Sequence, residues 1–165
     1  GKVFEVDGNS YQILNPSITN GSVRLLSYTQ DASQIQIPER VQIGDYYYFI
    51  EEIAIRAFCN CVKMRTLILP NCVRIISDGA FMIVKIVLGK DDDIKLHSIG
   101  KKAFAENEHL REIYFAGRNL RKVYPATFEG IRKTIKVLVL PAEKAKIEKL
   151  LQKALREGKV LIDLI

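Results

Sequence analysis

Residues 53–76 read IAIRAFCNCVKMRTLILPNCVRII and contain one full unit of an internal repeat. The pair Ala57-Phe58 returns at equal intervals as Ala80-Phe81 and Ala103-Phe104, and then, one position later than that interval predicts, as Thr127-Phe128. An aliphatic residue stands five positions before each phenylalanine: Ile53, Ile76, Ile99 and Val123. A fixed period of about 23 residues indicates a chain built from stacked structural units.

Each unit also contains a short alternating stretch that predicts a β-strand. Pro70 closes the strand in the quoted stretch because it has no N–H for a continuing ladder, and Pro38 and Pro141 stand at equivalent points. We therefore expect parallel strands near residues 34–38, 65–69, 85–88, 111–115 and 136–140. The alternation assigns these side chains to the core: Leu67, Leu69, Ile86, Leu88, Ile113, Phe115, Leu138 and Leu140, with Phe58, Phe81, Phe104 and Phe128 as a stacked spine.

The repeat length predicts the fold class. A unit this short cannot bury its own apolar face, but stacked units share one continuous core, and the length lies within the range of leucine-rich repeats. We predict an α+β repeat solenoid, a short leucine-rich-repeat stack that forms a single domain over residues 1–165. Its expected parts are an N-terminal β-hairpin cap (1–33), the solenoid (34–141) with a hairpin insertion (41–50), and a C-terminal helix–strand cap (142–165). The first hairpin is expected to turn at Asp7-Gly8-Asn9, and residues 22–28 to form a further strand. In the C-terminal cap, residues 159–165 are expected to form a closing strand, and one face of the helix carries Ile147, Leu150, Leu151, Ala154 and Leu155.

The quoted stretch resembles the BspA-like leucine-rich repeat. The resemblance rests on these positions: Ile53, Ala57-Phe58, Cys61, Met64, Leu67, Leu69-Pro70, Val73 and Ile76. It covers about residues 34–141, and the Gly-x-x-Ala-Phe tract of the family is kept at 100–104, whereas Ala54 replaces that glycine in the first repeat. The family occurs in surface and secreted proteins of gut and oral bacteria, some of them adhesins. The resemblance implies an extracellular or cell-surface binding protein.

The second repeat departs from the pattern. Phe81 stands five positions before Ile86, whereas Phe58 stands nine positions before Leu67, and the acidic segment 90–94 makes up the length after the strand. Three consecutive aspartates in that segment could bind calcium. Hydrated loop acids are favoured instead, because no glycine and distal glutamate complete an EF-type loop. We expect no metal site.

Composition narrows the protein class. Of 165 residues, 48% are hydrophobic and 27% charged, as in ordinary globular domains, and no apolar run approaches the length of a membrane span. The chain begins at Gly1 without a methionine, so an export signal is expected to have been removed. The three cysteines lack the paired spacing of a zinc site, and buried reduced thiols are favoured over a disulfide or a metal site.

The chemical inventory argues against catalysis. The two histidines, His97 and His109, stand in unlike repeat contexts, and no glycine-rich phosphate loop is present. A nucleophilic pair of Cys59 or Cys61 with a histidine finds no support in the repeat register. We therefore expect neither an enzyme nor a cofactor.

The exposed strand face is the favoured binding site, because its side chains alternate away from the core and align across the units. The predicted site consists of Ile68, Val87, Tyr114 and Val139, flanked by Thr66, Lys85 and Glu112. The row also includes Gln36, and the flanking row includes Gln34 and Val137. The expected ligand is a protein or a glycan, although such a strip can also be covered by the N-terminal cap or a neighbouring molecule, or reflect β-propensity alone.

Two other functions remain open. Residues 111–159 hold 13 Lys/Arg against 5 Asp/Glu, a net +8, and their basic patch of Lys144, Lys149 and Lys153 would bind an anionic polymer or a lipid headgroup, although a solvated face is the simpler interpretation. Nucleic acid is the least favoured anion, because exposed aromatics do not alternate with the basic residues. The third possibility is a purely structural segment of a surface protein. The sequence does not indicate an oligomeric state.

Overall fold

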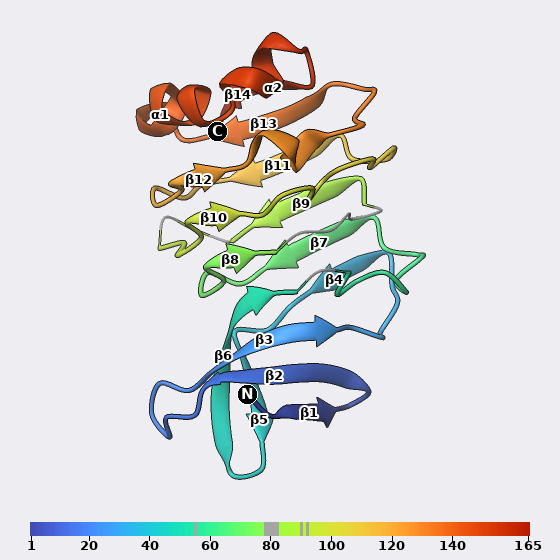
Figure 1. Cartoon of the computed structure of the whole chain (residues 1–165), viewed down its shortest axis with the longest axis vertical. Helices are drawn as coiled ribbons and strands as arrows, with labels where there is room; N and C mark the ends of the chain where they lie inside the picture. The colour runs from blue at the N-terminus through green and yellow to red at the C-terminus, as the bar shows by residue number, and fades with distance from the viewer. Residues whose placement is uncertain (55, 78–82, 90, 92) are drawn as a thin grey trace.

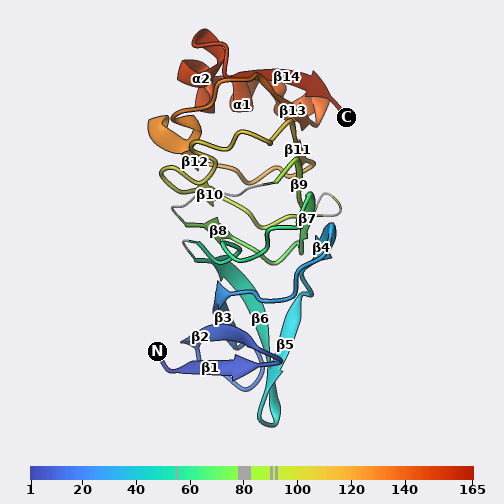
Figure 2. The same ribbon diagram turned by 90° about the vertical axis from the view of Figure 1, so that its right-hand side faces the viewer.

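A computed structural model of the chain describes residues 1–165 except 55, 78–82, 90 and 92. The chain advances in short rungs along one long axis, with the first strands at one end and the helices at the other (Figure 1). Two sheets lie on opposite sides of a shared interior (Figure 2). The elements are mostly strands with a few short helices, so the expected α+β repeat fold is correct as a repeat but is largely β in content.

Sheet A contains eight strands in the described part of the chain, in the order β1-β2-β3-β6-β8-β10-β12, with β5 paired to β6. Their bounds are β1 (Val3–Val6), β2 (Asn9–Asn15), β3 (Ser22–Ser27), β5 (Arg40–Ile43), β6 (Tyr46–Ile53), β8 (Ile75–Ile76), β10 (Ser98–Ile99) and β12 (Lys122–Val123). The β1–β2, β2–β3 and β5–β6 pairs are antiparallel. From β3 onward, the path through β6, β8, β10 and β12 is parallel.

Two predicted hairpins are present in this sheet. The first joins β1 to β2 through Asp7 and Gly8, whose φ angles of 51° and 81° give the left-handed turn that matches strand twist. The second joins β5 to β6 through Gly44, at a φ of 63°, and occupies the predicted insertion. The strand predicted at residues 22–28, after the first hairpin, is β3.

Sheet B contains the predicted repeat strands. Its members are β4 (Gln34–Gln36), β7 (Thr66–Leu69), β9 (Lys85–Leu88), β11 (Glu112–Phe115), β13 (Ile135–Val139) and β14 (Val160–Leu164). The order is β14-β13-β11-β9-β7-β4 and every pair is parallel. The five predicted parallel strands are confirmed, and β14 is the strand predicted to close the chain.

The core lies between the two sheets as one continuous apolar cluster. The inward residues predicted for β7, β9 and β11 are all 3% exposed or less: Leu67, Leu69, Ile86, Leu88, Ile113 and Phe115. Phe104 stacks on Phe128 with ring centroids 5.8 Å apart, whereas Phe58 contacts Tyr28 at 5.7 Å. Phe81, the remaining member of the predicted spine, lies outside the described residues.

The predicted register of β13 is wrong by one residue. Leu138 and Leu140 are only partly buried, whereas Val137 and Val139 are 5% and 0% exposed. Phe115 pairs with Val139 across the sheet, so Val139 is the inward residue. The prediction aligned Pro141 with Pro70, but Pro70 directly follows the inward Leu69, whereas one further residue separates Pro141 from Val139.

The predicted C-terminal helix is present but divided. Pro141–Glu143 form a short 3-10 helix, η2, followed by α1 (Lys144–Leu150) and α2 (Gln152–Arg156). Ile147, Leu151 and Ala154 are buried on one face, as the sequence pattern predicted. A further 3-10 helix, η1 (Pro125–Phe128), precedes β13. In the described part of the chain, no helix has the length and apolar character needed to cross a bilayer.

Candidate functional site

The outward face of sheet B brings most of the predicted site residues together. Ile68 pairs with Val87, and Val87 pairs with Tyr114, so the three side chains lie in one row across β7, β9 and β11. All three are partly buried, as expected for neighbours about 4.8 Å apart that shield one another. Gln36 precedes Ile68 in the same row on β4.

Val139 does not belong to this row, because its side chain is fully buried in the core. Leu138 pairs with Tyr114 and takes the outward position instead. On β14 the row continues to Asp163, which pairs with Leu138. The corrected row is therefore an apolar strip of Ile68, Val87, Tyr114 and Leu138 between polar ends, and we call it the apolar row.

A charged row runs beside it, as predicted. Thr66, Lys85 and Glu112 pair across β7, β9 and β11, and the Lys85 ammonium lies 3.1 Å from the Glu112 carboxylate. Lys136, on β13, follows Glu112 in register, whereas the expected Val137 points inward. Alternating charges in register stabilise neighbouring strands and keep this part of the face soluble. Two adjacent rows of different chemistry could therefore contact one ligand.

Sheet A carries a pocket that the sequence analysis missed. Arg74, His97 and Arg121 directly precede β8, β10 and β12 and recur at the repeat interval. The His97 amide donates to the Arg74 carbonyl at 2.9 Å, and the Arg121 amide donates to the His97 carbonyl at 2.9 Å. The three residues therefore occupy one position on successive rungs.

The side chains two residues before these three lie on the same face, because strand side chains alternate with a period of two. They are Cys72, Lys95 and Asn119. The resulting pocket has a volume of about 630 Å³. Its walls are formed by Glu51, Cys72, Arg74, Lys95, His97, Asn119 and Arg121. We call it the basic pocket. The signal for it in the sequence is the recurrence of Arg74, His97 and Arg121 at the repeat interval.

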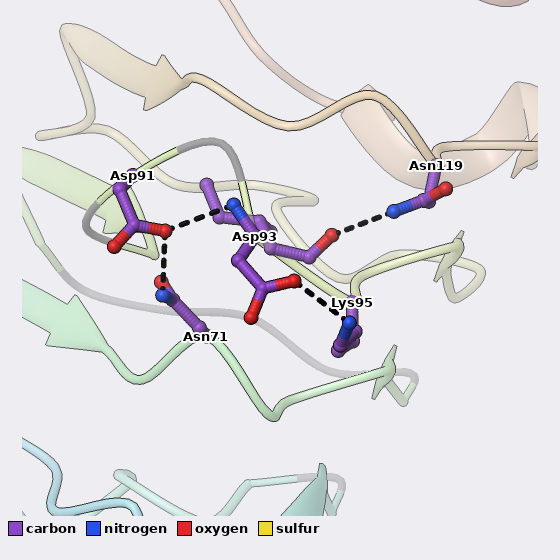
Figure 3. Close-up of polar contacts among 6 residues, drawn as sticks. Asn71, Asp91, Asp93, Lys95 and Asn119 are labelled. Carbon is purple, nitrogen blue, oxygen red and sulfur yellow. Dashed lines mark hydrogen bonds and ion pairs between the residues drawn. The ribbon is translucent and has the colours of Figure 1, made fainter.

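Asp91 and Asp93, between β9 and β10, lie near Lys95 (Figure 3), and Lys95 lines this pocket. Asp91 accepts hydrogen bonds from the Asn71 side-chain amide at 2.8 Å and from the backbone amide of Asp93 at 2.9 Å. Asp93 in turn pairs with the Lys95 ammonium at 2.8 Å. These two carboxylates therefore face donors, and the described residues contain no cluster of three or more potential metal ligands.

The helix lysines of the predicted basic patch are all exposed. Lys149 and Lys153 line a pocket of about 220 Å³ together with Arg156, whereas Lys144, at the start of α1, does not line it. Lys153 is also within 3.8 Å of Glu157. The structure thus brings two of the three predicted lysines to one small pocket beside the helices.

Comparison with known proteins identifies the repeat. The model of the BspA type leucine rich repeat region matches residues 27–154 in six copies. The chain belongs to this family. The match extends the resemblance found in the sequence at both ends, and it includes β4 through most of α2. No curated protein sequence matches the chain.

Two solved structures are similar in fold to this chain. A leucine-rich cell surface protein from Faecalibacterium prausnitzii matches with a TM-score of 0.58 at 16% identity, over 86% of this chain and 43% of that one. The pneumococcal vaccine antigen PcpA matches with a TM-score of 0.50 at 15% identity, over 85% and 43%. This BspA-type chain therefore spans less than half the length of either protein.

The cysteines of this BspA-type chain occupy three different environments. Cys61, at the core position of the repeat, is buried and its thiol donates to the Tyr28 carbonyl at 3.4 Å. Burial raises the pKa of Cys61, and burial together with Glu39 raises the pKa of Cys72 to about 12. Cys59 is exposed, which contradicts the expectation that all three thiols are buried.

We expect a thiol reagent such as DTNB at pH 8 to modify one cysteine of the native protein rapidly. Cys59 is accessible, whereas Cys61 and Cys72 are held as protonated thiols by their raised pKa, and the thiolate is the reactive form. Unfolding in guanidinium should release all three. Rapid native modification that persists in Cys59→Ser would show that the assigned environments are wrong.

Proposed function

We propose that the chain is a non-catalytic binding module of a secreted or cell-surface bacterial protein, and that it recognises a protein or a glycan through the outward face of sheet B. The observation that carries the proposal is the apolar row. Parallel sheets are usually covered on both faces, yet no helix or strand of the described residues covers this one (Figure 2). Adjacent apolar and charged rows offer both contact area and orientation to a ligand.

The family supports the assignment to the outside of the cell. One solved neighbour is described as a leucine-rich cell surface protein and the other as a vaccine antigen. We extend that location to this chain as part of the proposal.

The architecture proposed with this function is one domain over residues 1–165. A single apolar cluster runs from Tyr11 to Val160, which supports one folding unit. We assign residues 1–33 and 142–165 as caps of a solenoid over 34–141, with the hairpin 41–50 inserted. Burial of Tyr11 and Leu151 supports the caps, because each covers apolar core that an end unit would otherwise expose to water.

The test is a screen of the intact protein on glycan and host-protein arrays, followed by variants of the face. The double variant Ile68→Ser/Tyr114→Ser should abolish capture while the far-ultraviolet circular dichroism is unchanged, because both side chains point away from the core. Val62→Ser, at an exposed apolar side chain outside both sheets, is the matched control and should retain binding. A ligand that binds the double variant as tightly as the parent does not use this site.

A second candidate function is binding of an anionic polymer or lipid headgroup at the helix lysines. The supporting observation is the pocket that Lys149 and Lys153 share with Arg156. Charge-driven binding weakens steeply with salt, whereas binding by the apolar row does not. The test is retention of the protein on heparin or on anionic vesicles. Replacing Lys144, Lys149 and Lys153 by glutamine should reduce that retention only if this second function is correct.

A further inference from the structure

We propose that the basic pocket binds the oxyanion group of a small acidic ligand, a carboxylate, sulfate or phosphate, with Arg121 as its main contact. The pocket lies along the N-terminal ends of β8, β10 and β12 in sheet A. It is separate from the apolar row on sheet B and from the helix lysines. The inference therefore stands independently of the function proposed above.

The charges of the pocket favour an anion. Its walls carry three permanent cations, Arg74, Lys95 and Arg121, against one carboxylate, Glu51. Glu51 lies 3.3 Å from the Arg74 guanidinium, and Lys95 is paired with Asp93 outside the pocket wall. Among the described residues, Arg121 has no ion-pair partner. Its guanidinium is free to bind a carboxylate, sulfate or phosphate through two parallel hydrogen bonds.

The shape of the pocket fits a small ligand. A volume of about 630 Å³ lies within the usual range for ligand sites, roughly 300–1,000 Å³. Neighbouring rungs are about 4.8 Å apart, so Arg74 and Arg121 stand about 10 Å apart with His97 between them. One oxyanion at Arg121 therefore leaves room for polar groups of the same ligand to reach His97 and Arg74.

The pKa of the His97 imidazole should change when an oxyanion binds in the pocket. Burial first, and then the positive charges of Arg74 and Arg121, lower the pKa of its imidazole, while Glu52 on β6 raises it. Lys95 on its own segment and Glu51 on β6 also line the pocket. A bound oxyanion offsets the repulsion by the two guanidinium groups and raises the pKa of His97. Binding should therefore take up a proton and strengthen as the pH falls through the raised pKa of His97 in the complex.

Cys72 also lines the pocket, and its thiol is not poised to react with a ligand. Its thiol donates to the carbonyl of Ile50 at 3.2 Å, and its pKa is raised to about 12. The thiol stays protonated at neutral pH and is a poor nucleophile. We therefore assign Cys72 no nucleophilic role and treat recognition in this pocket as non-covalent, although a cysteine and a histidine share its wall.

The experiment is a nuclear magnetic resonance titration of the two histidine ring signals with sulfate, phosphate and glucuronate, at constant ionic strength set by chloride. We expect a saturable shift of His97, with the shift of His109 absent or non-saturating. Repeating the sulfate titration at pH 5.5 and 7.5 should give tighter binding at the lower pH. Preference for glucuronate would indicate an acidic sugar, and preference for sulfate or phosphate an esterified ligand.

Arg121→Gln should weaken binding about tenfold or more, because it removes a charge-assisted hydrogen bond. Lys122→Gln is the matched control: it removes the same charge from the next residue, whose ammonium lies 4.5 Å from the Tyr124 ring centroid, and binding should be retained. Both changes are at exposed positions, so the fold is expected to persist. The proposal is overturned if no probe shifts His97 saturably, if only His109 responds, or if both variants weaken binding equally.

Discussion

Val139→Asp should unfold the protein or lower its free energy of unfolding by at least about 3 kcal/mol, because the new carboxylate has no partner in the core. Val139 is 0% exposed and lies between the two sheets. It pairs with Phe115 on the neighbouring strand β11. The loss is large against the total stability of about 5–15 kcal/mol that is typical of a folded protein. Urea unfolding followed by circular dichroism measures it.

The adjacent residue provides the matched control. Leu138→Asp places the same group on the outward side of the same strand, where water can reach it, and should cost about 1 kcal/mol or less. The sequence-based register would reverse the two results. Equal damage from both variants would contradict the alternation of β13 described above.

Phe104→Ala should lower the free energy of unfolding by about 3–5 kcal/mol, the usual range for a buried phenylalanine. Phe104 is fully buried, and its ring stacks on Phe128 at 5.8 Å. The truncation therefore removes both its own burial and a contact between successive rungs. Thermal and urea unfolding both report the change.

The control for this variant is Val62→Ala, at a side chain that is 75% exposed. It should leave the free energy of unfolding within about 0.5 kcal/mol of the parent. A melting temperature of Phe104→Ala that matches the control would mean that the phenylalanine positions do not form the core of the stack.

Much of the fold could be predicted because the repeat marks the same positions again and again. The phenylalanine interval placed β7, β9 and β11, and the turn residues Asp7 and Gly8 placed the first hairpin. The register of β13 failed because its sequence, IKVLV, is apolar at nearly every position. Lys136 and the spacing from Phe128 to Val137, which matches that from Phe58 to Leu67, indicate the correct alternation, whereas the position of Pro141 indicates the opposite one.

The candidate site was only partly predictable for a different reason. Ile68, Val87 and Tyr114 could be assigned because a strand face follows from alternation alone. The basic pocket could not, because it depends on residues just before very short strands, where alternation gives little signal. Arg74 and Arg121 stand two repeat intervals apart, and His97 occupies the same position in the unit between them, so residue type alone does not mark the three as one row.

The parallel rungs of sheet B also determine how the chain can find its fold. From β7 to β14, each pairing of neighbouring strands closes a loop of about one repeat unit, as Leu69 with Leu88 and Phe115 with Val139 illustrate. Loop-closure entropy grows slowly with length and is nearly the same for each of these steps. Folding can therefore nucleate on any adjacent pair of units and propagate in both directions, with partly folded chains that are shorter versions of the native stack.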